Sequence, residues 1–253
     1  MADYLLVHGA GQGAWSWGPV WGHLTAPVQH PPRLHTPRRA NKVYPLDLPG
    51  HGVNAGKGDT ARVSLDGCVQ AIIGAVAREG LRDVVLVGHG FAGLPLLQAA
   101  QQLPHPPKRL VLIAGIVPDN QRSLLAVFPP RTRKAFQILK ALSAMARQDP
   151  RLPRWVITHY LCNGIDPMEV VHILGSFGPL PTHALTARVS VPGLKAPCPV
   201  TYVVLTQDRV LPPHIQRRMA GRIPDVEVLP LDSCHQVTLA KPKELADLLL
   251  GYA

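Results

Sequence analysis

The sequence predicts an α/β fold, a mostly parallel sheet with helices on both faces and a small helical cap. Short apolar runs alternate with amphipathic stretches in residues 4–117 and again in residues 200–252, and such alternation is typical of parallel sheets. Several runs are continuously apolar, as in strands that are buried on both faces. Residues 119–195 lose the alternation and gain Pro and Arg. We therefore expect one domain with a core of residues 1–118 and 196–253 and a cap insertion of residues 119–195.

Six runs have the length and composition of strands. They are residues 4–7, 43–48, 84–87, 109–117, 200–205 and 226–231. The second run contains Pro45, which has no N–H to donate, so this strand should lie where a ladder bond can be spared.

The stretches between these runs have helical spacing. In residues 64–79 the apolar positions Leu65, Cys68, Ile72 and Val76 recur at this spacing, and Gly80 follows as a stop signal. The other expected helices are residues 16–24, 94–103, 123–145 with a break at Pro129–Pro130, 155–162, 168–174, 212–223 and 243–252. Residues 27–42 are rich in Pro, Arg and His, so we expect a surface loop there.

Length and composition restrict the class of protein. The chain has 253 residues, enough for a sizeable core, and no apolar run reaches the ~18 residues of a membrane span. The first residues lack the basic start of a signal peptide, so we expect a cytoplasmic protein without a membrane partner. The 4 cysteines are scattered without a C-x-x-C pair, which argues against a zinc site or a disulfide framework.

The formal net charge of +10 leaves an acidic partner open, such as nucleic acid, an acidic carrier protein or a phosphorylated substrate. A basic, solvated surface that keeps the protein soluble is the more common explanation of such a charge. Aromatic residues are sparse among the cations, so we expect no nucleic acid, while an acidic carrier protein and a homodimer stay open. No phosphate-binding or dinucleotide fingerprint appears, and we expect no cofactor and no metal.

The most informative stretch is residues 83–93, DVVLVGHGFAG. A buried strand runs into a Gly-rich turn and then into an amphipathic helix. This resembles the nucleophile elbow of α/β-hydrolases, G-x-S-x-G. Here the motif reads Gly88-His89-Gly90-Phe91-Ala92, so Gly90 stands at the position of the nucleophilic serine and Ala92 at that of the last glycine.

Further segments extend the resemblance to the branch of hydroxynitrile lyases and plant-type methylesterases. They are LVHGAGQGAW, YPLDLPGHG, RLVLIAGIVPD, VLTQDRVLPPHIQRRM and HQVTLAKPKELADLLL. The resemblance implies that His235 is the general base and that Asp208 orients it. It also implies an oxyanion hole from the backbone N–H groups of Ala10 and Phe91.

Other candidates for these roles are weaker. Asp119 is a rival acid, but it follows Pro118 and suits a helix cap equally well. We expect His89 to pack under the elbow in a structural role. Cys234 adjoins His235, yet neighbouring residues on an extended loop point apart, so we do not expect Cys234 to replace the missing nucleophile.

A glycine at position 90 excludes a covalent acyl-enzyme on that side chain. One hypothesis is a natural enzyme in which the His235–Asp208 dyad acts as general base on a small hydrophobic carbonyl, ester or lactone, by direct hydrolysis or in a lyase or cyclase reaction. A second is an esterase-type serine hydrolase present as an inactive Ser-to-Gly variant. A third is a receptor or scaffold without catalysis. Apolar residues of the cap are candidates for lining a pocket for a small hydrophobic ligand, although ordinary cap core is the more common role for such residues: Leu124, Leu125, Phe128, Phe136, Trp155, Tyr160 and Phe177.

Overall fold

The computed structural model describes residues 2–26, 41–56, 63–145, 150–191 and 194–252. Residues 27–40 of the expected surface loop lie outside these ranges. All six expected strands form one parallel sheet. They are β1 (Tyr4–Val7), β2 (Val43–Leu46), β3 (Val85–His89), β4 (Arg109–Ile113), β5 (Val200–Leu205) and β6 (Glu227–Leu231). Their order is β2-β1-β3-β4-β5-β6, which confirms the predicted fold class.

Two local features explain where strands lie and end. Strand β2 lies at an edge of the sheet and has a neighbouring strand on one side alone. Pro45, which pairs with Leu6, therefore lies where a missing N–H donor can be tolerated, as predicted. Strand β4 ends at Ile113, earlier than the expected residues 109–117. The cause is local, because Ala114 has a φ of 45°, and a left-handed residue breaks the extended backbone.

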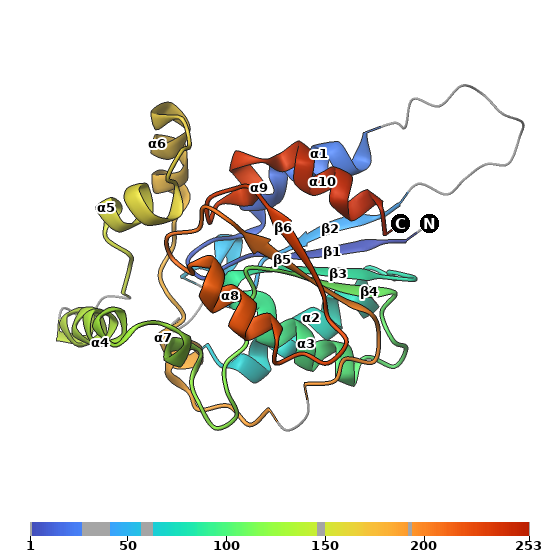
Figure 1. The fold of residues 1–253 in the computed structure, drawn as a ribbon, viewed down its shortest axis with the longest axis horizontal. Coiled ribbons are helices and arrows are strands. Elements are labelled where there is room, and N and C mark those ends of the chain that lie inside the picture. The colour runs from blue at the N-terminus through green and yellow to red at the C-terminus, as the bar shows by residue number, and fades with distance from the viewer. Residues whose placement is uncertain (1, 27–40, 57–62, 146–149, 192–193, 253) are drawn as a thin grey trace, which may run out of the picture.

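Alternate residues of the strands pack on opposite faces of the sheet. Tyr4 and Leu6 belong to one core cluster, and Leu5 and Val7 belong to the other. Helices α1 (Gly18–Thr25) and α10 (Pro242–Leu250) cover the first face, together with the short α9 (Val237–Ala240). Helices α2 (Leu65–Arg78), α3 (Gly93–Gln102) and α8 (Pro213–Ala220) cover the second (Figure 1).

The chain between β4 and β5 holds most of the remaining helices, near the carboxyl ends of the strands (Figure 1). A 3-10 turn (Leu124–Val127) and α4 (Pro130–Met145) replace the single stretch 123–145, divided at the prolines as expected. They are followed by α5 (Arg154–Val156), a π-helical turn (Ile157–Leu161), α6 (Pro167–Ser176) and α7 (Thr182–Thr186). We call residues 119–195 the insertion. That the insertion is a distinct cap stays a prediction.

Close packing of α3 against the segment after β4 requires a glycine. A Cβ added to Gly93 would lie 2.7 Å from the backbone N of Ile116 and 2.8 Å from the carbonyl carbon of Gly115. Backbone atoms cannot move aside as a side chain can. The start of α3, and with it the turn at Gly90, is therefore held against β4 by the absence of a side chain.

We predict that Gly93→Ala lowers the free energy of unfolding by about 1–3 kcal/mol through overpacking. Gly74→Ala on α2 is the matched control, since a Cβ at Gly74 meets no atom within 4 Å. There the same substitution should stabilise by about 0.5–1 kcal/mol, because alanine favours a helix interior. Urea titrations measure both values, and equal effects at the two sites would contradict the packing argument.

Candidate active site

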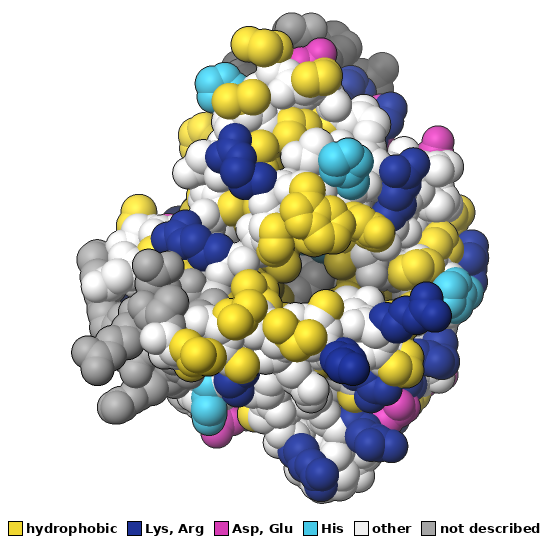
Figure 2. All heavy atoms as spheres, turned by 90° about the vertical axis from the view of Figure 1, so that its left-hand side faces the viewer, with side chains coloured by type: hydrophobic (Ala, Val, Ile, Leu, Met, Phe, Trp, Pro, Cys, Tyr) yellow, Lys and Arg dark blue, Asp and Glu magenta, His cyan; other side chains and the backbone are white. Residues whose placement is uncertain are grey.

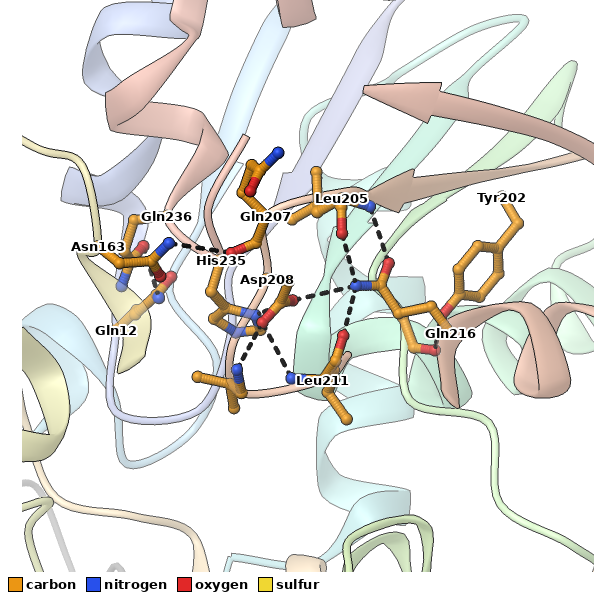
Figure 3. A network of polar contacts seen from close by, with 12 residues as sticks. Gln12, Asn163, Tyr202, Leu205, Gln207, Asp208, Leu211, Gln216, His235 and Gln236 are labelled. Carbon is orange, nitrogen blue, oxygen red and sulfur yellow. Dashed lines mark hydrogen bonds and ion pairs between the residues drawn. The ribbon is translucent and has the colours of Figure 1, made fainter. Parts of the chain in front are cut away.

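The carboxylate of Asp208 follows β5 and is fully buried. Its Oδ2 accepts hydrogen bonds from Nδ1 of His235 at 2.7 Å and from Nε2 of Gln216 at 3.2 Å. Its Oδ1 accepts from the backbone N–H groups of Val210 at 2.8 Å and Leu211 at 2.9 Å (Figure 3). A buried carboxylate is stable only when hydrogen bonds replace its hydration. These four donors provide that replacement and fix the orientation of the carboxylate.

The imidazole of His235 lies on the loop between β6 and α9 and is almost fully buried. Nδ1 is engaged by Asp208, whereas Nε2 faces the turn after β3: a Cβ added to Gly90 would lie 3.6 Å from it. A carboxylate on one ring nitrogen fixes the tautomer and stabilises the imidazolium, and the other nitrogen can then exchange a proton. The arrangement is suited to general-base chemistry over Gly90.

The turn between β3 and α3 places Gly90 in a left-handed conformation, with a φ of 51°. Its carbonyl accepts the N–H of Ile116 at 2.8 Å, which anchors the turn to the segment after β4. A side chain at Gly88 would overlap Leu96. The strand–turn–helix geometry predicted from residues 83–93 is therefore present and is enforced by close contacts on both sides.

Ala10 and Phe91, from the turns after β1 and β3, both line the same cavity. The loop after β1 is tied to the His235 loop by Nε2 of Gln12, which donates to Oε1 of Gln236 at 3.0 Å (Figure 3). Among the described residues, the backbone N–H groups of Ala10 and Phe91 donate no backbone hydrogen bond in the loops and turns. The family resemblance assigns the oxyanion hole to these two groups, and this assignment stays a prediction.

The cavity beside His235 has a volume of about 170 Å³. Gln12, Thr132 and His235 contribute its polar groups, and no charged side chain lines it. The other lining residues are Ala10, Gly90, Phe91, Ile116, Leu125, Phe128, Phe136, Leu152, Val156, Leu161, Leu180, Leu185, Val210 and Leu211. A cavity of this kind favours a small, uncharged, apolar ligand.

The structure divides the seven apolar candidates between the cavity, the core and the surface. Leu125, Phe128 and Phe136 do line the cavity. Leu124 instead belongs to the main core, and Phe177 packs edge-on against Trp15 with ring centroids 6.1 Å apart. Trp155 and Tyr160 point to solvent. Aromatic composition alone did not distinguish the inner and outer faces of these short helices.

The rejected candidates lie apart from this arrangement. Asp119 pairs with Arg222 at 2.6 Å on the surface and makes no contact with His235. Cys234 packs in a separate apolar cluster, and burial raises the pKa of its thiol. No group of three His, Cys, Asp or Glu side chains in the described ranges is placed to hold a metal ion.

Three further buried histidines lie behind the site. His89 contacts His235 with ring centroids 4.6 Å apart, and His51 contacts His8 at 5.0 Å. Nδ1 of His8 lies 2.8 Å from the carbonyl oxygen of Gly9, and Nε2 accepts the N–H of Leu48, which fits a neutral ring. Burial lowers the pKa of His8 to about 3. It also lowers the pKa of His51 and, assisted by the charge of His235, that of His89.

Comparison with known proteins identifies the family. The profile of the alpha/beta hydrolase family matches residues 4–248. The chain belongs to this family. It is therefore an enzyme of the α/β-hydrolase fold.

The relatives include plant esterases. Methylesterase 9 of Arabidopsis thaliana is 27% identical over 272 aligned positions, which cover 100% of this chain and 98% of the relative. A carbendazim hydrolyzing esterase of Nocardioides sp. (strain SG-4G) is 29% identical over 129 positions, 51% of this chain and 48% of the relative.

Solved structures share the fold. An extracellular alpha/beta-hydrolase from a Paenibacillus species superposes with a TM-score of 0.84 at 19% identity, over 100% of this chain and 99% of the other. Polyneuridine aldehyde esterase gives 0.69 at 16% identity, over 99% of both chains.

Gln216 was not singled out from the sequence, yet it holds the acid loop in place. It is fully buried on α8, and its Nε2 lies within hydrogen-bond distance of Asp208 and of the carbonyl oxygens of Leu205 and Leu211. Its Oε1 accepts the N–H of Leu205 at 2.9 Å. The only sequence signal was an amide next to the buried apolar residues Ile215, Met219 and Ala220 of a basic helix.

We predict that Gln216→Glu weakens the His235–Asp208 hydrogen bond, because a second carboxylate replaces the donor to Asp208. The loss of a hydrogen bond to a charged group costs about 1.5–3 kcal/mol. The far-downfield proton NMR signal of His235 Nδ1–H should shift or broaden in Gln216→Glu and vanish in Asp208→Asn. The exposed control Gln70→Glu should leave it unchanged, and an unchanged signal in Gln216→Glu would reject the role.

The buried histidines lead to a prediction about how the stability of the protein depends on pH. Because folding lowers their pKa values, the unfolded chain binds more protons as the pH falls below about 6.5, so stability decreases with acidification. Each histidine contributes a slope of about 1.4 kcal/mol per pH unit, and for His8 this persists towards pH 3. Urea titrations between pH 7 and pH 5 should show the loss, with a smaller slope in His89→Leu. Stability independent of pH in this range would contradict neutral burial.

Proposed function

We propose that this enzyme hydrolyses esters of small, uncharged, apolar substrates by direct attack of a water molecule, without a covalent intermediate. The observation that carries the proposal is the intact His235–Asp208 pair, with Nε2 of His235 aimed across an apolar cavity at Gly90. The curated relatives named methylesterases and esterases support ester hydrolysis as the reaction class. In this proposal Gly90 occupies the position of the nucleophile.

The proposed reaction has two steps. Nε2 of His235 removes a proton from a water held over Gly90, and the oxygen of that water forms a bond to the ester carbonyl carbon. The N–H groups of Ala10 and Phe91 stabilise the resulting oxyanion. The oxyanion then collapses, the carbon–alkoxide bond breaks, and His235 returns its proton to the leaving alcohol. Asp208 stabilises the imidazolium between the two steps.

A second candidate is an esterase lineage in which Gly90 replaced the serine and the covalent reaction was lost. One specific observation favours it. A Cβ at Gly90 would meet its nearest neighbours, Nε2 and Cε1 of His235, at 3.6 and 3.8 Å, which are ordinary contacts. The space above the turn would therefore accept a serine side chain, although the φ of 51° would strain the serine backbone.

We predict that the natural chain hydrolyses p-nitrophenyl acetate about 10³–10⁴-fold faster than water alone, the residual rate typical of a site lacking one triad member. His235→Ala should lower kcat/KM by about 10²-fold or more. The natural chain should show no burst and no labelling by a fluorophosphonate. A tight ligand without turnover, unaffected by His235→Ala, would instead indicate a receptor.

Gly90→Ser separates the two enzymatic candidates, with Gly90→Ala as the control that adds a Cβ without a hydroxyl. Under direct hydrolysis, both variants should be no faster than the natural chain, since each crowds the water position. A burst, phosphonate labelling and a large rate gain in Gly90→Ser alone would support the lost-nucleophile candidate.

A further inference from the structure

Exposed apolar side chains are concentrated on the insertion. Of the 10 large apolar side chains that are exposed in the described ranges, 7 belong to it. They are Ile138, Leu142, Met145, Trp155, Tyr160, Met168 and Val171. Figure 2 shows hydrophobic side chains gathered around a hollow on this side of the molecule, with Lys and Arg side chains around them. A contiguous apolar area on a protein surface commonly marks an interaction site.

Helix α4 has two different apolar sides. Thr132 and Phe136 line the cavity, so one side faces inward. Ile138, Leu142 and Met145 recur at i, i+4 and i+7 on the opposite side, and they are 51%, 58% and 82% exposed. No described residue buries this outer stripe.

The same helix is strongly basic. It carries Arg131, Arg133, Lys134 and Lys140, and residues 120–148 contain no Asp or Glu. No ion pair joins these four cations to another described residue; Lys140 contacts only the hydroxyl of Thr186. Arg131 and Lys134 precede Ile138 by seven and four residues, so they share the side of the outer stripe.

We propose that the outer side of α4, together with Trp155 of α5, docks on an anionic lipid surface. An amphipathic helix with Lys and Arg beside protruding apolar side chains is the pattern of interfacial membrane binding. Trp and Tyr favour the same interface, and Trp155 contacts Tyr160 with ring centroids 6.2 Å apart.

Charge and shape favour lipid over the other occupants. A second copy would bring two basic helices together on chains of net charge +10. An acidic protein matches the charge, but Ile138, Leu142 and Met145 protrude from a convex helix, and a soft apolar phase accepts such side chains without a matching groove.

The proposal goes beyond the expectation of no membrane partner, which rested on the lack of a spanning run. None of the described helices is long and apolar enough to cross a bilayer, and interfacial docking needs no such helix.

Co-sedimentation with phosphatidylcholine vesicles, with and without about 30% phosphatidylserine, tests the proposal. We expect binding only to the anionic vesicles, weakened by salt. Arg131→Gln with Lys134→Gln should lower the partition coefficient about 25-fold, at about five-fold per cation. Ile138→Ser with Leu142→Ser should lower it about ten-fold or more.

Matched controls carry the same changes outside the insertion. Val53→Ser with Val228→Ser removes two other exposed apolar side chains, and Arg217→Gln with Arg218→Gln removes two exposed cations of α8. Both should bind as the natural chain does. Circular dichroism checks that every variant is folded.

Three results would overturn the proposal. The first is no binding to anionic vesicles, or binding that the α4 variants leave unchanged. The second is a dimer in sedimentation velocity that Ile138→Ser with Leu142→Ser dissociates, without lipid binding, which would assign the face to a second copy. The third is tighter binding, through the same residues, to a purified bacterial acyl carrier protein than to vesicles. The assay measures binding without turnover, so its result does not depend on the proposed reaction.

Discussion

The hydrogen bond between Asp208 and His235 is the interaction on which the candidate active site depends. Both groups follow neighbouring parallel strands, β5 and β6, so the sheet brings them together although they are 27 residues apart. Placing a carboxylate in the interior is costly unless its oxygens are satisfied. Here two backbone N–H groups, an imidazole and the Gln216 amide share that task, and every one of them becomes part of the active-site scaffold.

Gly90 changes the energetic balance of this scaffold. The turn is held in a left-handed conformation by contacts at Gly88 and Gly93, and these contacts do not depend on the side chain at position 90. A non-glycine residue in that conformation costs on the order of 1–3 kcal/mol. Glycine at position 90 avoids this strain.

Sequence reasoning was effective where a local pattern determines the structure. The strand, Gly-rich turn and helix around Gly90 follow from apolar periodicity and turn chemistry, and the edge position of β2 follows from the missing N–H of Pro45. The approach of His235 to Asp208 was inferred only through family resemblance, since no local pattern encodes a contact between distant loops.

Sequence reasoning was weak where tertiary packing determines the contacts and the direction of a side chain. In the sequence, Gln216 cannot be distinguished from the other polar residues of a basic helix. Its role depends on the loop that carries Asp208, which contacts it only in the folded chain. Trp155 and Phe136 are both aromatic residues of the insertion, but one points to solvent and the other into the cavity. The direction of each depends on how the helices of the insertion pack over the sheet, and α5, which carries Trp155, has only 3 residues, too few for periodicity to determine it.

The inner and outer sides of the insertion differ in the molecules that they favour. Its inner side, with Leu125, Phe128 and Phe136, supplies apolar surface without charge, so a charged molecule that entered would lose its hydration without compensation. Its outer side carries cations, which act at a distance and do not need a close fit. The cations that give the net charge of +10 lie outside the cavity, which no Lys or Arg side chain of the described residues lines. They act on what approaches the molecule, while the cavity determines what can bind next to His235.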